Sequence, residues 1–277
     1  MLISVIITTK NEEKNIGNCL KSVLAQTYPL GNIEIIVVDN NSSDKTEDIV
    51  REFQKEHALL NLKMFNQGPE RSAQKNFGVK KSSGEFFIHL DADMVLSENV
   101  IAECVKKVSS DKNIIALFIS EIVRGKSLFS KIRRFEREFY DGTAIDAVRF
   151  IKKNKFQEAE SFDEALYACE DWDLSKRLNK LGEFAIIKSP LYHNETESKL
   201  AKYLKKKEYY SKNVDVYIGK WGKNDPDIKK QFGFYYRYIG VFMEKKKWKK
   251  ILRHPVLAFG MYSIRLLVGI KFLTRQP

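Results

Sequence analysis

The chain has 277 residues, of which 43% are hydrophobic and 30% charged, so it can bury a substantial core in one large domain or in a catalytic domain with an appendage, and disordered and fibrous classes are excluded. Its net charge of +12 is unevenly distributed, because residues 198–277 carry +15 and residues 1–197 carry −3. Such a basic segment could bind nucleic acid, anionic lipid head groups or phosphorylated substrates.

The cysteines and the N-terminus indicate the compartment. Cys19, Cys104 and Cys169 lie far apart and fit no metal-binding or redox spacing, so free thiols in a reducing compartment are predicted. Residues 2–9 are too short an apolar run for the core of a signal peptide and lead directly into charged residues. We therefore expect no signal peptide and a protein that stays on the cytoplasmic side.

Short apolar segments alternate with helical patterns in the first 95 residues. Runs rich in Ile, Val and Phe predict buried strands at residues 3–9, 33–39, 60–65 and 86–91. Apolar residues recur every three or four positions over residues 16–24 and 49–53, which predicts intervening helices. This order predicts an α/β fold with a mainly parallel central sheet and helices on both faces. Ligands of such sheets bind beyond the carboxyl ends of the strands.

The second half has a weaker helical pattern over residues 128–154, a helix over residues 171–181 and a strand at residues 184–188. Beyond residue 198, lysines mix with aromatic residues. The final apolar run, residues 256–273, contains Arg265 and Lys271, and it therefore predicts an interfacial helix better than a membrane span.

Acidic residues stand at the predicted strand ends. Asp91 and Asp93 follow residues 86–90, where two carboxylates could hold Mg²⁺ or Mn²⁺ and leave positions for diphosphate oxygens, although the triplet alone also fits a surface loop. Asp39 could accept hydrogen bonds from a base or ribose, or belong to a polar turn. His193 could complete a metal shell, or be structural like most lone histidines.

Glu170 and Asp171 open the predicted helix over residues 171–181. Acidic residues at a helix start are commonly explained by the helix dipole. One of these carboxylates could instead act as a general base that deprotonates an acceptor hydroxyl.

Taken together, these segments resemble family 2 glycosyltransferases, which have the GT-A nucleotide-diphosphosugar transferase fold. The resemblance covers about residues 1–195 and rests on an ordered set of motifs: SVIITTKNEE (4–13), IIVVDNNSSD (35–44), GPERSAQKNFG (68–78), GEFFIHLDAD (84–93), FDE (162–164) and EDWDLSKRL (170–178). It implies a catalytic domain at residues 1–197, with nucleotide-sugar binding in residues 1–95 and the acceptor side in residues 96–197, followed by a basic amphipathic helical region at residues 198–277.

The resemblance also implies roles for single residues. The base and ribose would be contacted by Thr9, Glu12 and Asp39. Arg71 and Lys75 would lie near the diphosphate or shape the loop beside it. Asp91 would bind the donor, and the metal ligands would be Asp93 and His193. Asp171 would be the catalytic base, supported by Glu170.

Some residues depart from the family pattern. Thr8, Lys10 and Asn40 stand where the family often has Pro, an aromatic residue and Asp, which affects the identity of the base more than the chemistry. Glu160-Ser161 stands where many relatives have two glycines. With one base and no candidate covalent nucleophile, the expected mechanism is inverting.

Similarity to enzymes that handle polyprenol-linked sugars implies a polyprenol- or dolichol-linked acceptor and favours GDP-mannose as donor, with a UDP-sugar as the other option. The tail is expected to bind an anionic membrane surface peripherally, at its cytoplasmic face. Two alternatives remain, a nucleotidyltransferase and a basic nucleic-acid-binding protein. A nucleotidyltransferase would usually have a glycine-rich loop after the first strand, whereas this chain has Thr9-Lys10-Asn11-Glu12-Glu13 there. The nucleic-acid-binding alternative rests only on the basic tail. Its aromatic residues recur at roughly helical spacing, which a packed or interfacial helix explains more simply: Tyr209, Tyr210, Tyr217 and Trp221. We expect no nucleic acid partner.

Overall fold

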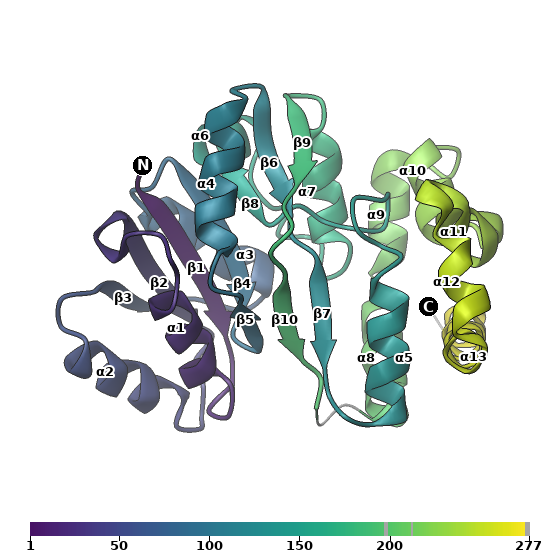
Figure 1. The fold of residues 1–277 in the computed structure, drawn as a ribbon, viewed down its shortest axis with the longest axis horizontal. Helices are drawn as coiled ribbons and strands as arrows, with labels where there is room; N and C mark the ends of the chain where they lie inside the picture. The colour runs from purple at the N-terminus through teal and green to yellow at the C-terminus, as the bar shows by residue number, and fades with distance from the viewer. Residues whose placement is uncertain (197–198, 212, 275–277) are drawn as a thin grey trace.

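The computed structural model describes residues 1–196, 199–211 and 213–274. Figure 1 shows an α/β body followed by a group of C-terminal helices. The strands are β1 (Ile3–Thr9), β2 (Ile33–Asp39), β3 (Asn61–Asn66), β4 (Phe86–Asp91), β5 (Met94–Leu96), β6 (Ile114–Phe118), β7 (Glu121–Arg124), β8 (Phe150–Lys152), β9 (Glu183–Ile186) and β10 (Leu191–Asn194).

The helices of the α/β body are α1 (Ile16–Leu24), α2 (Thr46–Glu56), α3 (Arg71–Lys81), α4 (Val100–Ser110), α5 (Leu128–Arg137), α6 (Lys153–Glu158) and α7 (Glu170–Leu178), with a short 3₁₀ turn, η1 (Leu30–Asn32). The C-terminal group comprises α8 (Leu200–Ser211), α9 (Val214–Trp221), α10 (Pro226–Phe232), the π-helical turn η2 (Tyr236–Gly240), α11 (Val241–Met243), the 3₁₀ turn η3 (Glu244–Lys246), α12 (Trp248–Arg253) and α13 (Pro255–Leu273).

The central sheet has the strand order β3-β2-β1-β4-β8-β6-β9. β1, β2, β3 and β4 pair in parallel, β8 runs antiparallel to both β4 and β6, and β6 pairs in parallel with β9. A smaller sheet has the order β5-β10-β7. The mainly parallel sheet is therefore as predicted, whereas the antiparallel insertion of β8 and the whole second sheet had no clear signal in the sequence.

Both faces of the central sheet are covered, because successive residues of β1 enter different cores. Ile3, Val5 and Ile7 pack with the α1 and α4 side, while Ile6 packs with α3, α6 and α7. Every residue of β1 and β2 is buried, which explains their continuous apolar runs. Cys19 on α1 and Cys104 on α4 are buried free thiols, as predicted.

Several element bounds differ from the sequence prediction. The third strand is shifted by one residue to Asn61–Asn66, and the helix expected over residues 171–181 is Glu170–Leu178. The weak helical pattern over residues 128–154 corresponds to α5, a loop and β8, because the apolar residues after Arg137 pack as a loop against the C-terminal helices. The expected domain boundary at residues 197 and 198 lies outside the described residues.

The C-terminal helices share a core with the α/β body. Ile132 and Phe135 of α5 pack with Phe242, Met261 and Ile264. Arg265 is buried rather than facing lipid, and its Nε donates to Glu136 of α5 at 2.9 Å. The sequence argument assumed that the charge of Arg265 would face lipid, and this assumption was wrong, because Glu136 pairs with Arg265 inside the protein.

Candidate active site

The candidate active site lies at the carboxyl ends of β1, β2 and β4. The register of these parallel strands places Thr8 beside Asp91 and Thr9 beside Asp39. Thr8 Oγ1 donates to Asp91 Oδ1 at 3.1 Å. Because the three strands end together, residues that are about 30 and 80 positions apart in the chain reach the same edge, as the sequence predicted.

The residues expected to contact base and ribose form a connected loop region. Buried Asp39 accepts hydrogen bonds from the backbone N–H and the hydroxyl of Ser42, at 2.7 and 2.5 Å. Glu12 accepts from Asn15 at 2.6 Å, and burial followed by repulsion from Asp93 and Asp91 raises its pKa despite that bond. Asp39 thus forms a polar turn with Ser42, while Glu12 belongs to the electrostatic environment of the Asp91-Asp93 pair.

Buried Thr9 has a different environment. Its Oγ1 has no hydrogen-bond partner among the described residues, and its backbone carbonyl accepts from Asn40 at 2.9 Å and from Gln74 Nε2 at 3.0 Å. A buried hydroxyl without a partner is unusual and fits a group that would bind a ligand.

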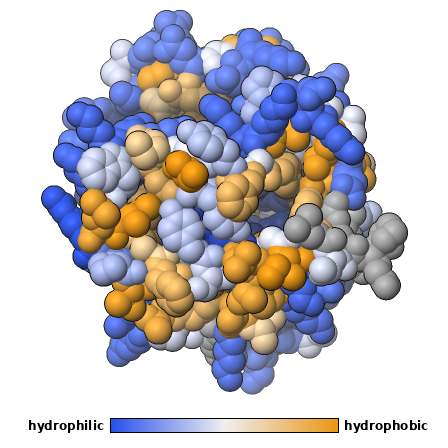
Figure 2. All heavy atoms as spheres, turned by 90° about the vertical axis from the view of Figure 1, so that its right-hand side faces the viewer, coloured by the Kyte–Doolittle hydropathy of each residue, from blue (hydrophilic) through white to orange (hydrophobic). Residues whose placement is uncertain are grey.

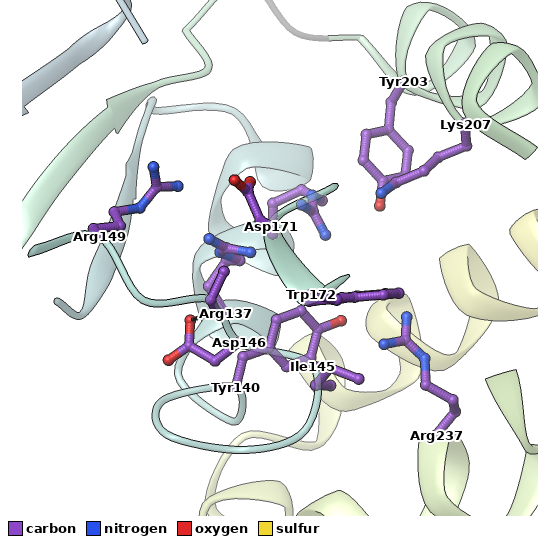
Figure 3. A pocket seen from close by; sticks show the side chains of 12 residues that line it. Arg137, Tyr140, Ile145, Asp146, Arg149, Asp171, Trp172, Tyr203, Lys207 and Arg237 are labelled. Carbon is purple, nitrogen blue, oxygen red and sulfur yellow. Dashed lines mark hydrogen bonds between the residues drawn. The ribbon is translucent and has the colours of Figure 1, made fainter. Parts of the chain in front are cut away.

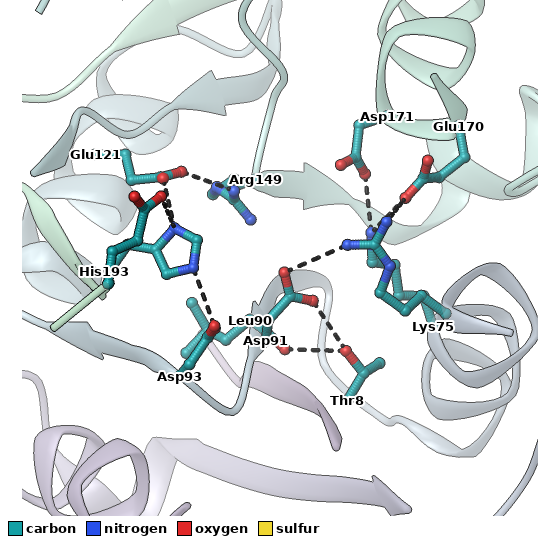
Figure 4. Close-up of polar contacts among 12 residues, drawn as sticks. Thr8, Lys75, Leu90, Asp91, Asp93, Glu121, Arg149, Glu170, Asp171 and His193 are labelled. Atoms are coloured by element: carbon teal, nitrogen blue, oxygen red, sulfur yellow. Dashed lines mark hydrogen bonds and ion pairs between the residues drawn. The ribbon is translucent and has the colours of Figure 1, made fainter. Parts of the chain in front are cut away.

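Arg71 links the strand end to the start of α7 (Figure 4). Its guanidinium lies 3.8 Å from Asp91 Oδ2 and 3.3 Å from Glu170 Oε1, and its Cζ is 5.3 Å from the ring of Tyr210 on α8. Burial acts to raise the pKa of Asp91, but attraction to Arg71 and Lys75 outweighs it and holds that pKa below its usual range. Asp91 is therefore ionised and positioned, as expected for a donor-binding carboxylate.

Lys75 lies beneath the two acidic residues that open α7. Only 2% of its side chain is exposed, its Nζ donates to Asp171 Oδ1 at 2.9 Å, and it lies 3.7 Å from Glu170 Oε1. Burial acts to raise the pKa of Asp171, but attraction to Lys75 outweighs this effect and holds the pKa below its usual range. The Asp171 carboxyl is therefore ionised. The structure thus places Lys75 against the candidate base rather than in an open donor pocket.

The α7 start itself is held in an unusual backbone conformation. Cys169, immediately before Glu170, has φ of 66°, in the left-handed region that costs a residue with a side chain about 1–2 kcal/mol. Glu170 is almost fully buried, and burial followed by repulsion from Asp171 raises its pKa. Strain of this kind is commonly found at functional sites.

Asp93 and His193 meet on the other side of Arg149 (Figure 4). His193 lies on β10, and its Nε2 is 3.0 Å from Asp93 Oδ2 while its Nδ1 is 2.8 Å from Glu121 Oε1. Burial acts to lower the pKa of His193, but Glu121 and Asp93 outweigh it and raise the pKa to about 10. His193 is therefore an imidazolium that donates to both carboxylates.

Glu121 was not found from the sequence. It begins β7, is nearly buried, and pairs with Arg137 and with Arg149, the latter at 3.1 Å. A carboxylate that holds the second nitrogen of a metal-binding histidine fixes the orientation of the ring. No motif marks Glu121, and only the pairing of β7 with β10 brings it to His193.

Asp93 and His193 together would suit a divalent cation whose remaining positions are filled by phosphate oxygens of a bound nucleotide or by water. Among the described residues no group of three or more His, Cys, Asp or Glu side chains could hold a metal. Asp93 Oδ1 is, however, buried without a hydrogen-bond partner. Mg²⁺ and Mn²⁺ are often bound by one or two protein ligands together with phosphate oxygens and water. Binding would require His193 Nε2 to release its proton.

His89 lies two residues before Asp91 in the sequence, but its side chain packs in the core of the fold and does not reach the candidate active site as a titrating group. Its ring is buried, and Nε2 lies 3.1 Å from the carbonyl oxygen of Val148. Burial, followed by repulsion from Lys75, lowers its pKa to about 3, so it is neutral.

A cavity of about 170 Å³ opens beside Asp171, and it was also missed from the sequence. Trp172, Tyr140 and several basic side chains line it, in part from the C-terminal helices. The candidate base therefore faces a space that the basic tail helps to build.

Comparison with known proteins gives a consistent family and fold. The model of the family described as glycosyl transferase family 2 matches residues 4–165. A Methanococcus voltae protein named as a dolichyl N-acetyl-alpha-D-glucosaminyl phosphate 3-beta-D-2,3-diacetamido-2,3-dideoxy-beta-D-glucuronosyltransferase is 44% identical over 87 residues, which are 31% of this chain and 27% of that protein. The match thus spans only about a quarter of that relative.

Two solved structures are similar over nearly the whole chain. The mannosyltransferase PcManGT from Pyrobaculum calidifontis, in complex with GDP-Man and Mn²⁺, has a TM-score of 0.67 and 19% identity, with 99% of this chain and 88% of that chain covered. S. aureus TarS in complex with UDP-GlcNAc has a TM-score of 0.59 and 18% identity, with 98% and 83% covered. At these identities the likeness concerns the fold.

Proposed function

Because this chain belongs to glycosyl transferase family 2 and has the GT-A fold, we propose that it is an inverting, metal-dependent glycosyltransferase that moves a hexose from a nucleotide-diphosphate sugar to a lipid-linked acceptor. The observation that carries this proposal is the separation of two groups across Asp91 and Arg149. The metal-ligand pair, Asp93 and His193, lies on one side, and the candidate base Asp171 lies on the other.

On the donor side, Thr9, Glu12 and Asp39 would contact the base and ribose, and Arg71 with Asp91 would contact the diphosphate and sugar. A bound Mg²⁺ or Mn²⁺ would neutralise the charge that develops on the departing diphosphate. Arg71 is suited to phosphate because its guanidinium offers a planar fork of donors.

On the acceptor side, Asp171 would accept the proton of an acceptor hydroxyl while that oxygen attacks the anomeric carbon. The new C–O bond forms as the bond to the nucleoside diphosphate breaks on the opposite face, which inverts the configuration. Because Lys75 keeps Asp171 ionised but weakly basic, proton transfer would occur late, once bond formation has made the hydroxyl acidic. Glu170 would hold Arg71 and Lys75 in place.

GDP-mannose is the favoured donor, with a UDP-sugar as the alternative. Solved structures of similar fold hold GDP-Man with Mn²⁺ in one case and UDP-GlcNAc in another. The lipid-linked acceptor is supported by the printed name of the Methanococcus voltae relative, which includes a dolichyl phosphate.

The C-terminal helices would attach the enzyme to the cytoplasmic face of a membrane. Figure 2 shows apolar side chains gathered on the face that these helices form, among hydrophilic ones. Val256, Phe259 and Leu266 of α13 are exposed. α13 is long and apolar enough to cross a membrane by length and composition. We propose peripheral attachment, with residues 1–197 as the catalytic domain and residues 198–277 as the membrane-associating region, because Arg265 already fixes α13 to α5.

Two of the four tail aromatics, Tyr217 and Trp221, are occupied by contacts within the protein, whereas Tyr209 is 54% exposed. Tyr217 is fully buried, and its hydroxyl donates to Gln231 at 2.9 Å. Trp221 donates to Asp173 at 2.8 Å. Side chains that are occupied in this way are poor platforms for stacking bases.

A donor screen tests the proposal. Purified full-length protein would be incubated with GDP-mannose, UDP-glucose or UDP-GlcNAc, a lipid-phosphate acceptor and either Mg²⁺, Mn²⁺ or EDTA. We expect acceptor-dependent release of nucleoside diphosphate from one donor, abolished by EDTA. Release of pyrophosphate would instead indicate a nucleotidyltransferase, and release unaffected by EDTA would contradict metal dependence.

A further inference from the structure

The cavity beside Asp171 has a cationic wall built from both halves of the chain. Its basic side chains come from α5, the segment before β8, α8 and η2: Arg133, Arg137, Arg149, Lys207 and Arg237. Figure 3 shows Arg149 and Arg137 on one side of this space and Lys207 and Arg237 on the other, with Asp171 at its edge. Its volume of about 170 Å³ equals the share of roughly five or six water molecules in the liquid, which is room for a phosphate group.

The acidic side chains that line the cavity leave most of this charge unbalanced. Only Asp146 and Asp171 are acidic among the lining residues. Asp171 already accepts from Lys75, and Asp146 accepts from two backbone N–H groups, at 2.8 and 2.9 Å.

Two buried glutamates behind the wall compensate the inner arginines. Glu121 pairs with both Arg137 and Arg149, and Glu136 pairs with Arg133. These pairs hold the guanidinium groups in place, and they leave each arginine with donors that are not used by its partner. The inner wall is therefore ordered as well as positively charged.

The outer wall is compensated only in part. Lys207 and Arg237 form no ion pair within the described ranges, and the carboxylate that attracts both of them, Glu136, is already paired with Arg133 and Arg265. Lys207 lines the cavity while its side chain stays exposed to solvent, so an anion can reach it from outside. Cations that converge on a cavity with too few carboxylates around them raise the free energy of the protein, and an anion that enters lowers it.

Building on the proposed function, we propose that this cavity binds a phosphate group of the acceptor and so holds the acceptor's nucleophilic oxygen at Asp171. Arginine forks bind phosphate oxygens in pairs, and a lysine adds a point charge. The same helices that supply Lys207 and Arg237 belong to the group that carries the exposed apolar face of α13, so a lipid chain attached to the phosphate could leave along that face.

The donor's diphosphate is a poorer occupant. It belongs with the metal ligands Asp93 and His193, which lie across Arg149 from Asp171 (Figure 4). The cavity lies on the Asp171 side, and neither metal ligand lines it. An anion in the cavity would therefore approach the sugar from the acceptor side.

Lys207→Met and Arg237→Met test the proposal, because neither change leaves an acidic partner unpaired. Lys205→Met on the exposed face of α8 and Arg253→Met on α12 are matched controls. Binding of a short isoprenyl phosphate would be measured by calorimetry on the full chain in detergent, without donor, and uncharged isoprenol would serve as the reference ligand. We expect each cavity variant to weaken isoprenyl phosphate binding at least 10-fold, with controls within twofold of the parent and isoprenol binding unchanged.

Kinetics separate this proposal from the proposed function. With an active donor, the cavity variants should raise KM for the lipid-phosphate acceptor at least 10-fold and leave KM for the donor within twofold. If donor turnover persists while the cavity variants bind isoprenyl phosphate like the parent, the cavity proposal is wrong and the transferase assignment stands. If isoprenyl phosphate binding falls as expected but no donor is ever turned over, the transferase assignment is wrong.

Two phosphate-bearing acceptors would use Asp171 differently. With a lipid phosphate monoester the phosphate oxygen is itself the nucleophile and carries no proton to remove, so Asp171→Asn should retain much of its rate. With a lipid diphosphate sugar the nucleophile is a hydroxyl, and Asp171→Asn should lose nearly all of it. Comparing both acceptors identifies the source of the phosphate, and equal affinity for isoprenol and isoprenyl phosphate would overturn the inference for either source.

Discussion

Lys75 Nζ donates to Asp171 Oδ1 at 2.9 Å, although the two residues are 96 positions apart and Lys75 is almost completely buried. A lysine of α3 is thus the fixed partner of the carboxylate that opens α7. This contact keeps Asp171 ionised and orients it, and it joins α3, which packs on β1 and β2, to the start of α7.

We expect Asp171→Asn to nearly abolish transfer to a hydroxyl acceptor while nucleotide affinity stays within a few-fold of the parent. As the proposed base, Asp171 would act in the transition state and would not be needed to hold the donor, so its loss should lower kcat. Single-turnover rates and calorimetry with nucleoside diphosphate would measure both effects. A variant that retains a tenth or more of the parent rate with that acceptor would refute the assignment.

Lys75→Met should lower kcat and move the acidic limb of the kcat–pH profile to higher pH. Lys75 depresses the pKa of Asp171, so its stabilising effect is present above the usual aspartate pKa of about 3.9 and is lost as pH falls through the lower folded value. The variant should lose roughly 2 kcal/mol of unfolding free energy at pH 7, with a smaller difference near pH 2. Lys80→Met, on the exposed end of α3, is the control, and an unmoved acidic limb would contradict the role of Lys75.

Asp93→Ala and His193→Ala should weaken both Mn²⁺ dependence and donor binding, with Asp93→Ala the more damaging because it removes charge as well as a ligand. Glu121→Gln should leave both ligands in place but lower Mn²⁺ affinity about 10–100-fold, since the histidine loses its orienting carboxylate. Calorimetry with Mn²⁺ in the presence of nucleoside diphosphate would measure these changes. Glu98→Gln, on the surface, should have no effect, and unchanged donor affinity in the two ligand variants would count against a metal site.

Membrane attachment should depend on exposed apolar side chains of α13. Phe259 and Leu266 are 77% and 57% exposed, so Phe259→Ser with Leu266→Ser should at least halve flotation with anionic liposomes without opening the core. Leu59→Ser, at a fully exposed leucine far from the tail, is the matched control. Truncating the tail is less informative, because α13 fills the core beside α5.

The lipid dependence of flotation separates three outcomes. Removing anionic lipid should weaken the parent, because each basic residue near the surface contributes about 1 kcal/mol. Flotation of the double variant equal to the parent would exclude α13 as the anchor. Resistance of the parent to salt and carbonate extraction would indicate a spanning helix.

Glu160→Gly should stabilise the protein by about 1 kcal/mol. Glu160 has φ of 63° and is exposed, so glycine removes backbone strain without removing a packed side chain. Glu158→Gly, two residues earlier and at the C-terminal end of α6, should destabilise the protein, because the helix loses a residue that favours the helical conformation and Lys155 loses its ion-pair partner. Urea unfolding of both variants would test the pair, and equal signs would contradict the argument.

The left-handed conformations of Glu160 and Ser161 are ones that glycine adopts without strain, which gives a physical reason for the two glycines that the family resemblance led us to expect there. The sequence pointed to these positions as a departure from the family pattern, and the fold supplies the physical reason. Glu160 and Ser161 should therefore affect the loop that they form mainly through its backbone conformation.

The sequence by itself determined the core strands and the acidic strand ends. Residues 3–9, 33–39 and 86–91 form β1, β2 and β4 with the predicted bounds, because a strand buried on both faces requires a local apolar run that can be read directly. Parallel pairing then brings Asp39 and Asp91 to one edge, so the general position of the site follows from element order alone.

Only the tertiary structure decided how the charged residues are paired. Glu121 and His193 are 72 positions apart, Asp93 and His193 are 100, and Arg265 and Glu136 are 129, and no local pattern encodes such contacts. A charge in the sequence has the same appearance whether it is solvated or buried, whereas its role depends on the packing that removes water and on the partner that packing supplies. For this reason Arg265 suggested an obstacle to membrane insertion in the sequence and is a buried partner of α5 in the fold.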